Sequence, residues 1–239
     1  MHAFANPARF GRISKIIQPW VIGLAVILLG IGFYWGLVVA PPDYQQGDSV
    51  RIMYLHVPAA WMGLFCYTFI AGASAVFLIW KHPLADLAAR SAAPLGAAFT
   101  LICLISGSLW GKPMWGTFWV WDARLTSMLV LLFLYVGYMA LASAFDDPTR
   151  GSKAASVLAL VGVVNIPIIK FSVDWWNTLH QPTSVMRLDG PTIDPALLWP
   201  LLVTALGFKA FFIALVLIRI DGEIAATKIR AMRMVEAGR

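Results

Sequence analysis

Six long apolar stretches, separated by short polar segments, set the pattern of this chain. Each stretch has about 20 residues, the length that an α-helix needs to cross the hydrocarbon core of a bilayer. A segment inside lipid must satisfy its own backbone hydrogen bonds, so each stretch is predicted to be a helix. We therefore expect an all-α integral membrane protein in which residues 1–239 form a single six-helix membrane domain. The stretches cover roughly residues 20–39, 59–80, 91–110, 125–145, 154–173 and 196–218.

The lysines and arginines are distributed unevenly between the two sets of connecting segments, and this bias predicts the orientation. With a cytoplasmic N-terminus, twelve of them fall on the cytoplasmic side and five on the other side. The twelve are Arg9, Arg12, Lys15, Lys81, Arg90, Arg150, Lys153, Arg219, Lys228, Arg230, Arg233 and Arg239, and the five are Arg51, Lys112, Arg124, Lys170 and Arg187. Both termini are therefore expected in the cytoplasm, with outer loops at about residues 40–58, 111–124 and 174–195.

The composition agrees with a membrane location and excludes several classes of function. Hydrophobic residues make up 60% of the chain and charged residues 13%, and the mean hydropathy is +0.76. The net charge of +6 is not taken as a sign of nucleic-acid binding, because its distribution across the loops explains it. Cys66 and Cys103 both lie inside apolar stretches and form no CxxC pattern, so they do not indicate a redox pair. No phosphate-binding glycine loop or hydrolytic motif is present.

An aromatic segment between the third and fourth apolar stretches is the most unusual part of the chain. It runs from Trp115 to Thr126 and contains Trp119, Trp121, Asp122 and Arg124 besides Trp115. An interfacial belt explains isolated tryptophans near span ends. It explains less well three tryptophans within seven residues, in a loop too short to span. A flat aromatic shelf beside a cation suits a flat, apolar ligand that bears acids, such as a porphyrin.

Two of the four histidines fall in the outer loops on either side of this segment. His56 and His180 share the pattern Leu-His-x-Pro with Pro58 and Pro182. Proline disfavours helix in its predecessor, so each histidine is expected on extended chain near the membrane edge, and Pro58 fits the first turn of the second span. Either histidine alone could be an ordinary interfacial residue, but the pair around a tryptophan cluster favours axial ligation of haem iron. Zinc is disfavoured because no third ligand accompanies them.

The remaining candidates are charged. Arg51 and Arg124 could hold carboxylates through forked hydrogen bonds, or could equally contact lipid headgroups or form a salt bridge within a loop. Asp122 precedes an apolar run, so capping of a helix is the simpler explanation for it. Lys209 is the basic residue deep in a span. An intramembrane charge is by default a functional candidate, and pairing within the bundle, contact with a partner subunit and snorkelling to the membrane edge are all open for it.

The segment Trp115–Thr126, with the sequence WGTFWVWDARLT, resembles the tryptophan-rich "WWD" signature of haem-handling membrane proteins used in cytochrome c maturation. Within that group, the six-span layout, the chain length and the two outer histidines resemble the CcmC family. The resemblance covers the chain from the first span to the sixth. Phe118 occupies a position that can be tryptophan in the family, and an aromatic shelf survives that change.

This resemblance implies a multi-pass protein of the bacterial inner membrane whose tryptophan segment faces the periplasm. It implies that haem b is held between that segment and His56 and His180, and is delivered to the haem chaperone CcmE. It also implies an ATP-driven part formed by CcmA and CcmB, with a small accessory subunit, CcmD. By motif position, the implied haem-binding residues are Trp115, Trp119, Trp121, Asp122 and Arg124, with Arg51 as the arginine shortly before the first histidine.

Two other functions fit parts of the sequence. A transporter of haem or another solute would use the six helices as a path, and Lys209 is its best support. A cytochrome b-like electron carrier usually places paired histidines within its spanning helices, whereas here both are expected in loops. Any enzymatic activity would be at most the transfer of haem to a partner.

Overall fold

A computed structural model describes residues 6–237 as an all-helical bundle. In this part of the chain, six helical segments are long and apolar enough to cross a membrane, which confirms the predicted fold class. His2 and Arg239 lie outside the described residues. The elements are α1 (Pro7–Tyr34), the π-helical turn η2 (Trp35–Val39), the 3-10 turn η3 (Asp48–Ile52), α2 (Met53–Trp80), α3 (Pro83–Trp115), α4 (Ala123–Ser143), α5 (Pro148–Gly162), α6 (Asn165–Trp175) and α7 (Pro195–Ala237).

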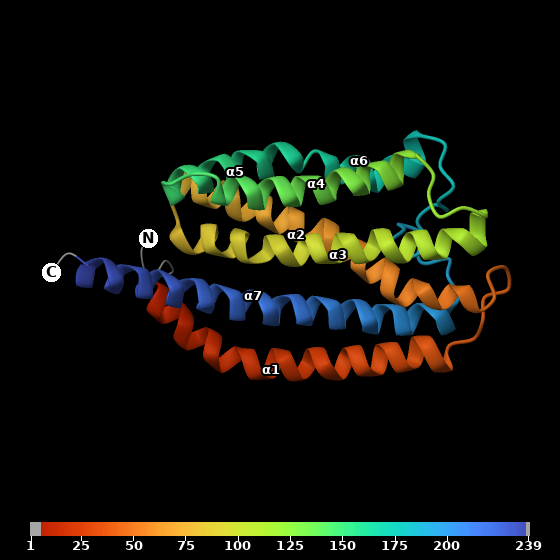
Figure 1. Cartoon of the computed structure of the whole chain (residues 1–239). Helices are drawn as coiled ribbons and strands as arrows, with labels where there is room; N and C mark the ends of the chain where they lie inside the picture. Colours follow the sequence, from red (N-terminus) through yellow and green to blue (C-terminus); the bar gives the residue numbers. More distant parts are fainter. Residues whose placement is uncertain (1–5, 238–239) are drawn as a thin grey trace.

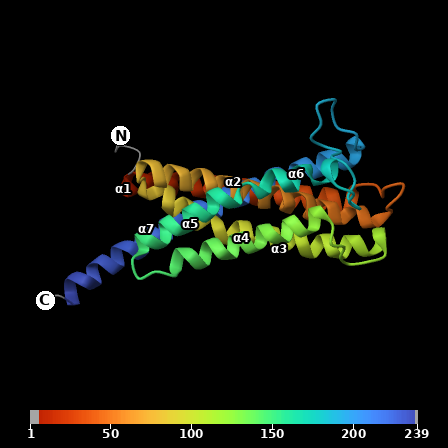
Figure 2. The same ribbon diagram turned by 90° about the horizontal axis from the view of Figure 1, so that it is seen from above.

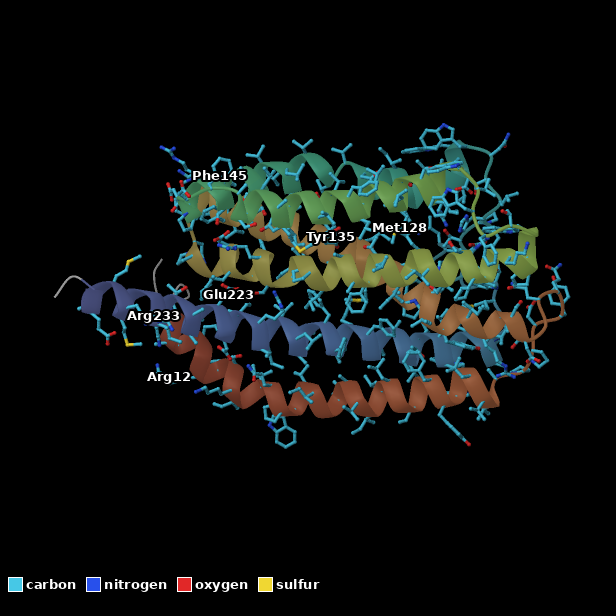
Figure 3. The ribbon with its side chains drawn as sticks, viewed as in Figure 1. Arg12, Met128, Tyr135, Phe145, Glu223 and Arg233 are labelled. Carbon is cyan, nitrogen blue, oxygen red and sulfur yellow. The ribbon has the colours of Figure 1, made fainter. Side chains whose placement is uncertain are left out.

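The helices run along one common axis in three groups (Figure 1). α2 packs against α3 in the middle, α4 packs against α5 and α6 on one side, and α1 packs against α7 on the other. Both termini lie at the same end of the bundle, as an even number of spans requires, and the end of α7 projects beyond the other helices (Figures 1 and 2). Arg12, Glu223 and Arg233 lie toward that end (Figure 3). The assignment of this end to the cytoplasm stays a prediction from the basic residues.

Close packing between the helices depends on small residues and on a few buried hydroxyl groups. Tyr135 of α4 is fully buried, and its hydroxyl donates a hydrogen bond to the carbonyl of Gly63 in α2 at 2.6 Å. A Cβ atom on Gly96 of α3 would overlap the Tyr135 ring. Figure 3 shows Tyr135 directed into the bundle from α4. These contacts bring α2, α3 and α4 close together in the middle of the bundle.

The structure corrects three local expectations. His56 is not on extended chain but in α2, because the helical path already begins at Asp48 and Pro58 lies inside the helix, not in its first turn. Membrane helices tolerate such a proline. Trp115 is the last residue of α3, not a loop residue. The fifth span is broken between α5 and α6, where the ring of Pro167 excludes the hydrogen bond to the carbonyl of Val163.

Candidate functional site

A cavity of about 420 Å³ lies at the end of the bundle opposite the termini. Pockets that enclose small ligands have volumes of roughly 300–1,000 Å³. The floor of this cavity includes Met128, which points into the bundle from α4 (Figure 3). Several of the residues predicted from the sequence meet in its lining, together with apolar side chains of α2, α3 and α4. Those predicted residues are His56, Trp115, Trp119, Arg124 and His180.

His56 reaches the cavity from α2 and is held by α3. Its Nδ1 atom lies 3.0 Å from the carbonyl oxygen of Cys103 and 3.2 Å from Oγ of Ser106. A carbonyl can only accept, so Nδ1 carries the proton and donates it to Cys103. The Ser106 hydroxyl donates to the carbonyl of Ile102 at 2.6 Å and is therefore also an acceptor for His56. The Nε2 atom then keeps its lone pair, which is the form of imidazole that binds a metal.

Gly107 makes room for the His56 ring. A Cβ atom at position 107 would lie 2.8 Å from Cε1 and 3.2 Å from Nδ1 of His56. Real Cβ atoms essentially never approach a neighbour that closely, so a larger residue would displace the ring. On the other side, Trp110 packs edge-on against His56, with ring centroids 5.6 Å apart. The imidazole is thus fixed by two helices before any ligand binds.

His180 reaches the same cavity from the non-helical segment after α6. Its backbone N–H donates to Oγ1 of Thr178 at 3.0 Å. Its Nδ1 atom lies 3.5 Å from Oδ2 of Asp122, and its ring meets Trp115 edge-on at 4.9 Å. Burial lowers the pKa of His180 below its ordinary value, and the nearby Arg124 charge adds to this effect, while Asp122 opposes it. His180 is therefore neutral at pH 7, with Nδ1 directed at an acceptor and Nε2 available.

Asp122 has two functions in this arrangement. Its Oδ1 atom accepts the backbone N–H of Leu125 at 2.8 Å, which confirms that it caps α4. Its Oδ2 atom faces His180. Asp122 does not line the cavity itself, so its contact with a ligand would be through His180.

The cavity has two cationic residues at its α4 and α6 edge. Arg124 donates from Nε to Oγ of Ser172 at 3.0 Å, and from Nη2 to the carbonyls of Ile169 and Lys170 at 3.3 and 3.2 Å. These bonds join the start of α4 to the last turns of α6. Nη1 of Arg124 has no acceptor among the described residues and is free to bind an anion. Lys170 is exposed and lines the same cavity, so a second positive charge lies beside Arg124.

The tryptophans do not act as one shelf. Trp115 and Trp119 line the cavity, and the indole N–H of Trp119 is buried with no hydrogen-bond partner among residues 6–237. Trp121 packs edge-on against Trp119 at 5.4 Å but is 75% exposed and faces an apolar groove between α3 and α4. Only the first two can cover a ligand in the cavity, and Trp121 instead supports Trp119 from the outside.

Arg51 lies away from the cavity. It donates to Oδ1 of Asp48 at 3.1 Å and to the carbonyls of Gly36 and Leu37 at 3.3 and 2.9 Å. Those carbonyls belong to the turn η2 that ends the first span. The side chain is thus positioned as a helix cap, a contact between distant segments that sequence spacing could not show.

Sequence reasoning also missed residues that the structure places at the site. The sequence indicates Lys170 only as an outer basic residue, and it places Gly107 and Ser106 inside a span. A basic residue close to the end of a span was the available signal for Lys170. No local signal exists for Gly107 or Ser106, because both contact His56, which lies about 50 residues earlier in the chain.

The chemistry of this set of residues fits a flat, acidic, metal-containing ligand. No three His, Cys, Asp or Glu side chains among residues 6–237 come together in a way that could hold a bare metal ion. A haem iron needs fewer protein ligands, because the porphyrin ring supplies the others. Two neutral imidazoles, two indoles and two cations in one apolar cavity match the iron, the ring and the carboxylates of such a ligand.

The whole chain is similar to a known family of membrane proteins. The family model described as "Heme exporter protein C" matches residues 1–235. "Heme exporter protein C" of Bradyrhizobium diazoefficiens is 54% identical over 235 residues, which is 98% of this chain and 89% of the relative. The protein of the same name from Escherichia coli K12 is 50% identical over 224 residues, 94% of this chain and 90% of the relative. A Marchantia polymorpha protein, "Putative cytochrome c biosynthesis ccmC-like mitochondrial protein", is 48% identical over 192 residues, 80% of each chain.

The family match extends over all six spans and over every residue that lines the cavity. With the membrane spans, they indicate a multi-pass protein of the bacterial inner membrane with a haem-related function in cytochrome c maturation. The chain belongs to the heme exporter protein C (CcmC) family.

Proposed function

We propose that this protein binds haem in the cavity at the periplasmic face of the membrane and delivers it to the haem chaperone CcmE. The observation that carries the proposal is the shared environment of His56 and His180. Both imidazoles line one cavity, and both have Nδ1 directed at an oxygen acceptor. Hydrogen-bond acceptors placed against Nδ1 fix the tautomer and orientation of histidines that bind metal through Nε2.

The other cavity residues have distinct roles in this proposal. His56 and His180 are the axial ligands of the haem iron, and Trp115 and Trp119 cover the porphyrin. Arg124 holds a propionate through Nη1, and Lys170 is close enough along the same edge to hold a second carboxylate. The unpartnered indole N–H of Trp119 is a further donor for the ligand. Asp122 acts through His180, while Arg51 and Trp121 act through the surrounding structure.

In this proposal the protein acts by positioning haem for its partner. Holding haem in one orientation at the membrane surface turns its encounter with a partner histidine into a reaction between prearranged groups. The loop of residues 176–194 forms one side of the cavity and carries His180. A partner therefore reaches the haem from the loop side, outside the membrane. CcmA, CcmB and CcmD are the further proposed partners, and any use of ATP belongs to them.

The direct test is the absorption spectrum of the detergent-purified protein, oxidised and reduced, for the wild type, His56→Ala and His180→Ala. We expect low-spin, six-coordinate haem in the wild type. Each substitution is expected to remove haem or convert it to a high-spin form. His82→Ala is the matched control, because His82 precedes α3 at the opposite end of the bundle and leaves the cavity intact.

Two results would overturn the proposal. One is a haem spectrum that is unchanged when both His56 and His180 are replaced by alanine. The other is a folded wild-type protein that contains no haem although it was purified from cells well supplied with haem. In the second case the tryptophan segment would be a docking surface for protein, and transport of another solute would become the leading function.

A further inference from the structure

Lys209 is a charged residue in the interior of the membrane that faces outward. It lies on α7, about 21 Å along the helix axis from Pro195 and about 15 Å from Arg219 at the usual rise of ~1.5 Å per residue. The side chain is exposed on the surface of the bundle. The ends of the span are therefore further away than a lysine side chain can reach. A charge at this depth is costly unless it is paired.

Among the described residues, the ring of Phe65 makes the direct contact with this charge. The Nζ atom lies 4.3 Å from the ring centroid of Phe65 in α2, a cation–π contact. Phe65 packs edge-on against Phe212 of α7, which fixes the ring under the ammonium group. No salt bridge to Lys209 is formed by the described residues. The cation–π contact orients the lysine toward α2 without neutralising its charge.

A second copy of this chain cannot neutralise Lys209 either. All twelve carboxylate side chains of the sequence lie in loops or near the ends of spans, none at the depth of Lys209. They are Asp43, Asp48, Asp86, Asp122, Asp146, Asp147, Asp174, Asp189, Asp194, Asp221, Glu223 and Glu236. The counter-charge must therefore come from a different molecule that enters the bilayer.

The surface around Lys209 has the shape that a helix needs for close approach. On α2, Phe65, Thr68 and Gly72 form one exposed row at helical spacing, and a Cβ atom on Gly72 would meet no atom within 4 Å. On α7, Leu206 and Ile213 are exposed on either side of Lys209. A small residue and an exposed hydroxyl beside bulkier apolar residues are typical of contacts between membrane helices.

We propose that the α2–α7 face around Lys209 is the docking site for a membrane-spanning helix of a different protein, which carries an aspartate or glutamate opposite Lys209. Charge complementarity inside the bilayer makes the contact specific, and the row from Phe65 to Gly72 provides the packing surface. This site lies on the lipid-facing surface and is separate from the haem cavity, whose lining does not include Lys209. The proposal therefore does not depend on haem binding.

The test is a zero-length cross-link in native membranes. Dicyclohexylcarbodiimide enters the bilayer and activates a carboxyl group, and a neighbouring lysine amine then forms an amide with release of dicyclohexylurea. Mass spectrometry is expected to find a peptide that joins Lys209 to an acidic residue within an apolar segment of another protein. Replacement of that acidic residue by its amide is expected to remove the cross-link.

Three variants separate pairing from other roles of Lys209. Lys209→Arg keeps the charge but forms no such amide, so it should lose the cross-link and retain the cross-linked partner during purification. Lys209→Leu should lose both the cross-link and the partner. The amount of partner that copurifies should fall about tenfold or more, as expected for a tenfold loss of affinity. Val136→Lys places a second lysine at a similar depth on an exposed position of α4, and this lysine should give no cross-link to the partner, while Lys209 keeps its own.

The proposal is wrong if Lys209 gives no cross-link to an acidic residue and Lys209→Leu retains every partner that the wild type retains. That pair of results would mean that no acidic membrane helix pairs with Lys209. The haem spectrum of purified Lys209→Leu should match the wild type. A loss of haem in this variant would show that the bundle is disturbed as a whole, and would also contradict an independent docking site.

Discussion

The carboxylate of Asp122 joins the start of α4 to His180, with Oδ1 on the backbone N–H of Leu125 at 2.8 Å and Oδ2 3.5 Å from Nδ1 of His180. One side chain thus fixes both a helix end and the orientation of an imidazole on a loop. The loop has no regular secondary structure between Trp176 and Asp194 to hold His180 in place. The position of His180 in the cavity therefore depends on Asp122 and on the edge-on contact with Trp115.

Asp122→Asn separates these two functions. Asparagine caps a helix about as well as aspartate, so α4 should keep its start. The negative charge opposite His180 is lost, and we expect haem affinity to fall by about 10- to 100-fold, the usual effect of removing a partner of a metal-binding histidine. Haem titration of the apoprotein measures this change. Asp122→Ala should additionally lower the free energy of unfolding by about 1 kcal/mol through loss of the cap. Equal haem affinity in Asp122→Asn and the wild type would exclude a role for the carboxylate in orienting His180.

The protonation of His180 gives a prediction for the dependence on pH. Burial and Arg124 lower the pKa of His180 below 6.5, and Asp122 partly opposes this shift. The unfolded chain therefore takes up a proton at a higher pH than the folded protein does. The contribution of this group to folding stability is complete above pH 6.5 and decreases as the pH falls below 6.5.

An NMR titration of histidine-labelled apoprotein should place the midpoint of His180 below 6.5. The midpoint should fall further in Asp122→Asn, because the charge that favours the imidazolium is gone. His180→Ala identifies the resonance. A midpoint at or above 6.5 would contradict the burial of His180 in the free protein.

Gly107→Ala should disturb haem binding although it replaces no iron-binding residue. The added methyl group would lie 2.8 Å from Cε1 of His56, so the imidazole must move from the carbonyl of Cys103. We expect a partly high-spin haem spectrum and a loss of stability of about 1–3 kcal/mol, as for other cases of overpacking. Gly30→Ala is the matched control, because a Cβ atom there has no neighbour within 4 Å. A low-spin spectrum in Gly107→Ala with unchanged haem affinity would show that His56 does not bind the iron from this position.

The six spans could be predicted because their cause is local. A run of about 20 apolar residues in lipid has few alternatives to a helix. The structure extends the predicted spans, since the second begins at Asp48 and the third continues to Trp115. Apolar composition marks only the part of a helix inside hydrocarbon, while the helical backbone continues into the polar region. Another local rule, the preference of residues before proline for extended backbone, gave the wrong conformation for His56. The helical path begins upstream of Pro58 and continues through His56.

The contents of the cavity could be predicted only in part. Unusual residue types in neighbouring outer loops pointed to His56, His180 and the tryptophans before any contact was known. The division between Trp119, which lines the cavity, and Trp121, which does not, depends on the path of a short loop. Spacing also could not show that Arg51 caps the first span, because its partners Gly36 and Leu37 are brought to it by tertiary packing.

Arg51 and Arg124 should differ in their effect on haem binding. The sequence makes both candidates for binding carboxylates, but in the structure Arg124 lines the cavity and Arg51 does not. Arg124→Ala removes a cation from the cavity and a link from α4 to α6, so haem affinity should fall strongly. Arg51→Ala removes hydrogen bonds to the end of the first span, so it should lower the thermal stability and leave haem affinity within about threefold, less than one tenfold step of 1.4 kcal/mol. Lys170→Ala should weaken haem binding with little change in stability, because the Lys170 side chain forms no hydrogen bond or salt bridge with the described residues 6–237. Haem titration and thermal unfolding of the three apoproteins separate these effects. An equal loss of haem affinity in Arg51→Ala and Arg124→Ala would mean that Arg51 leaves its cap and enters the cavity when haem binds.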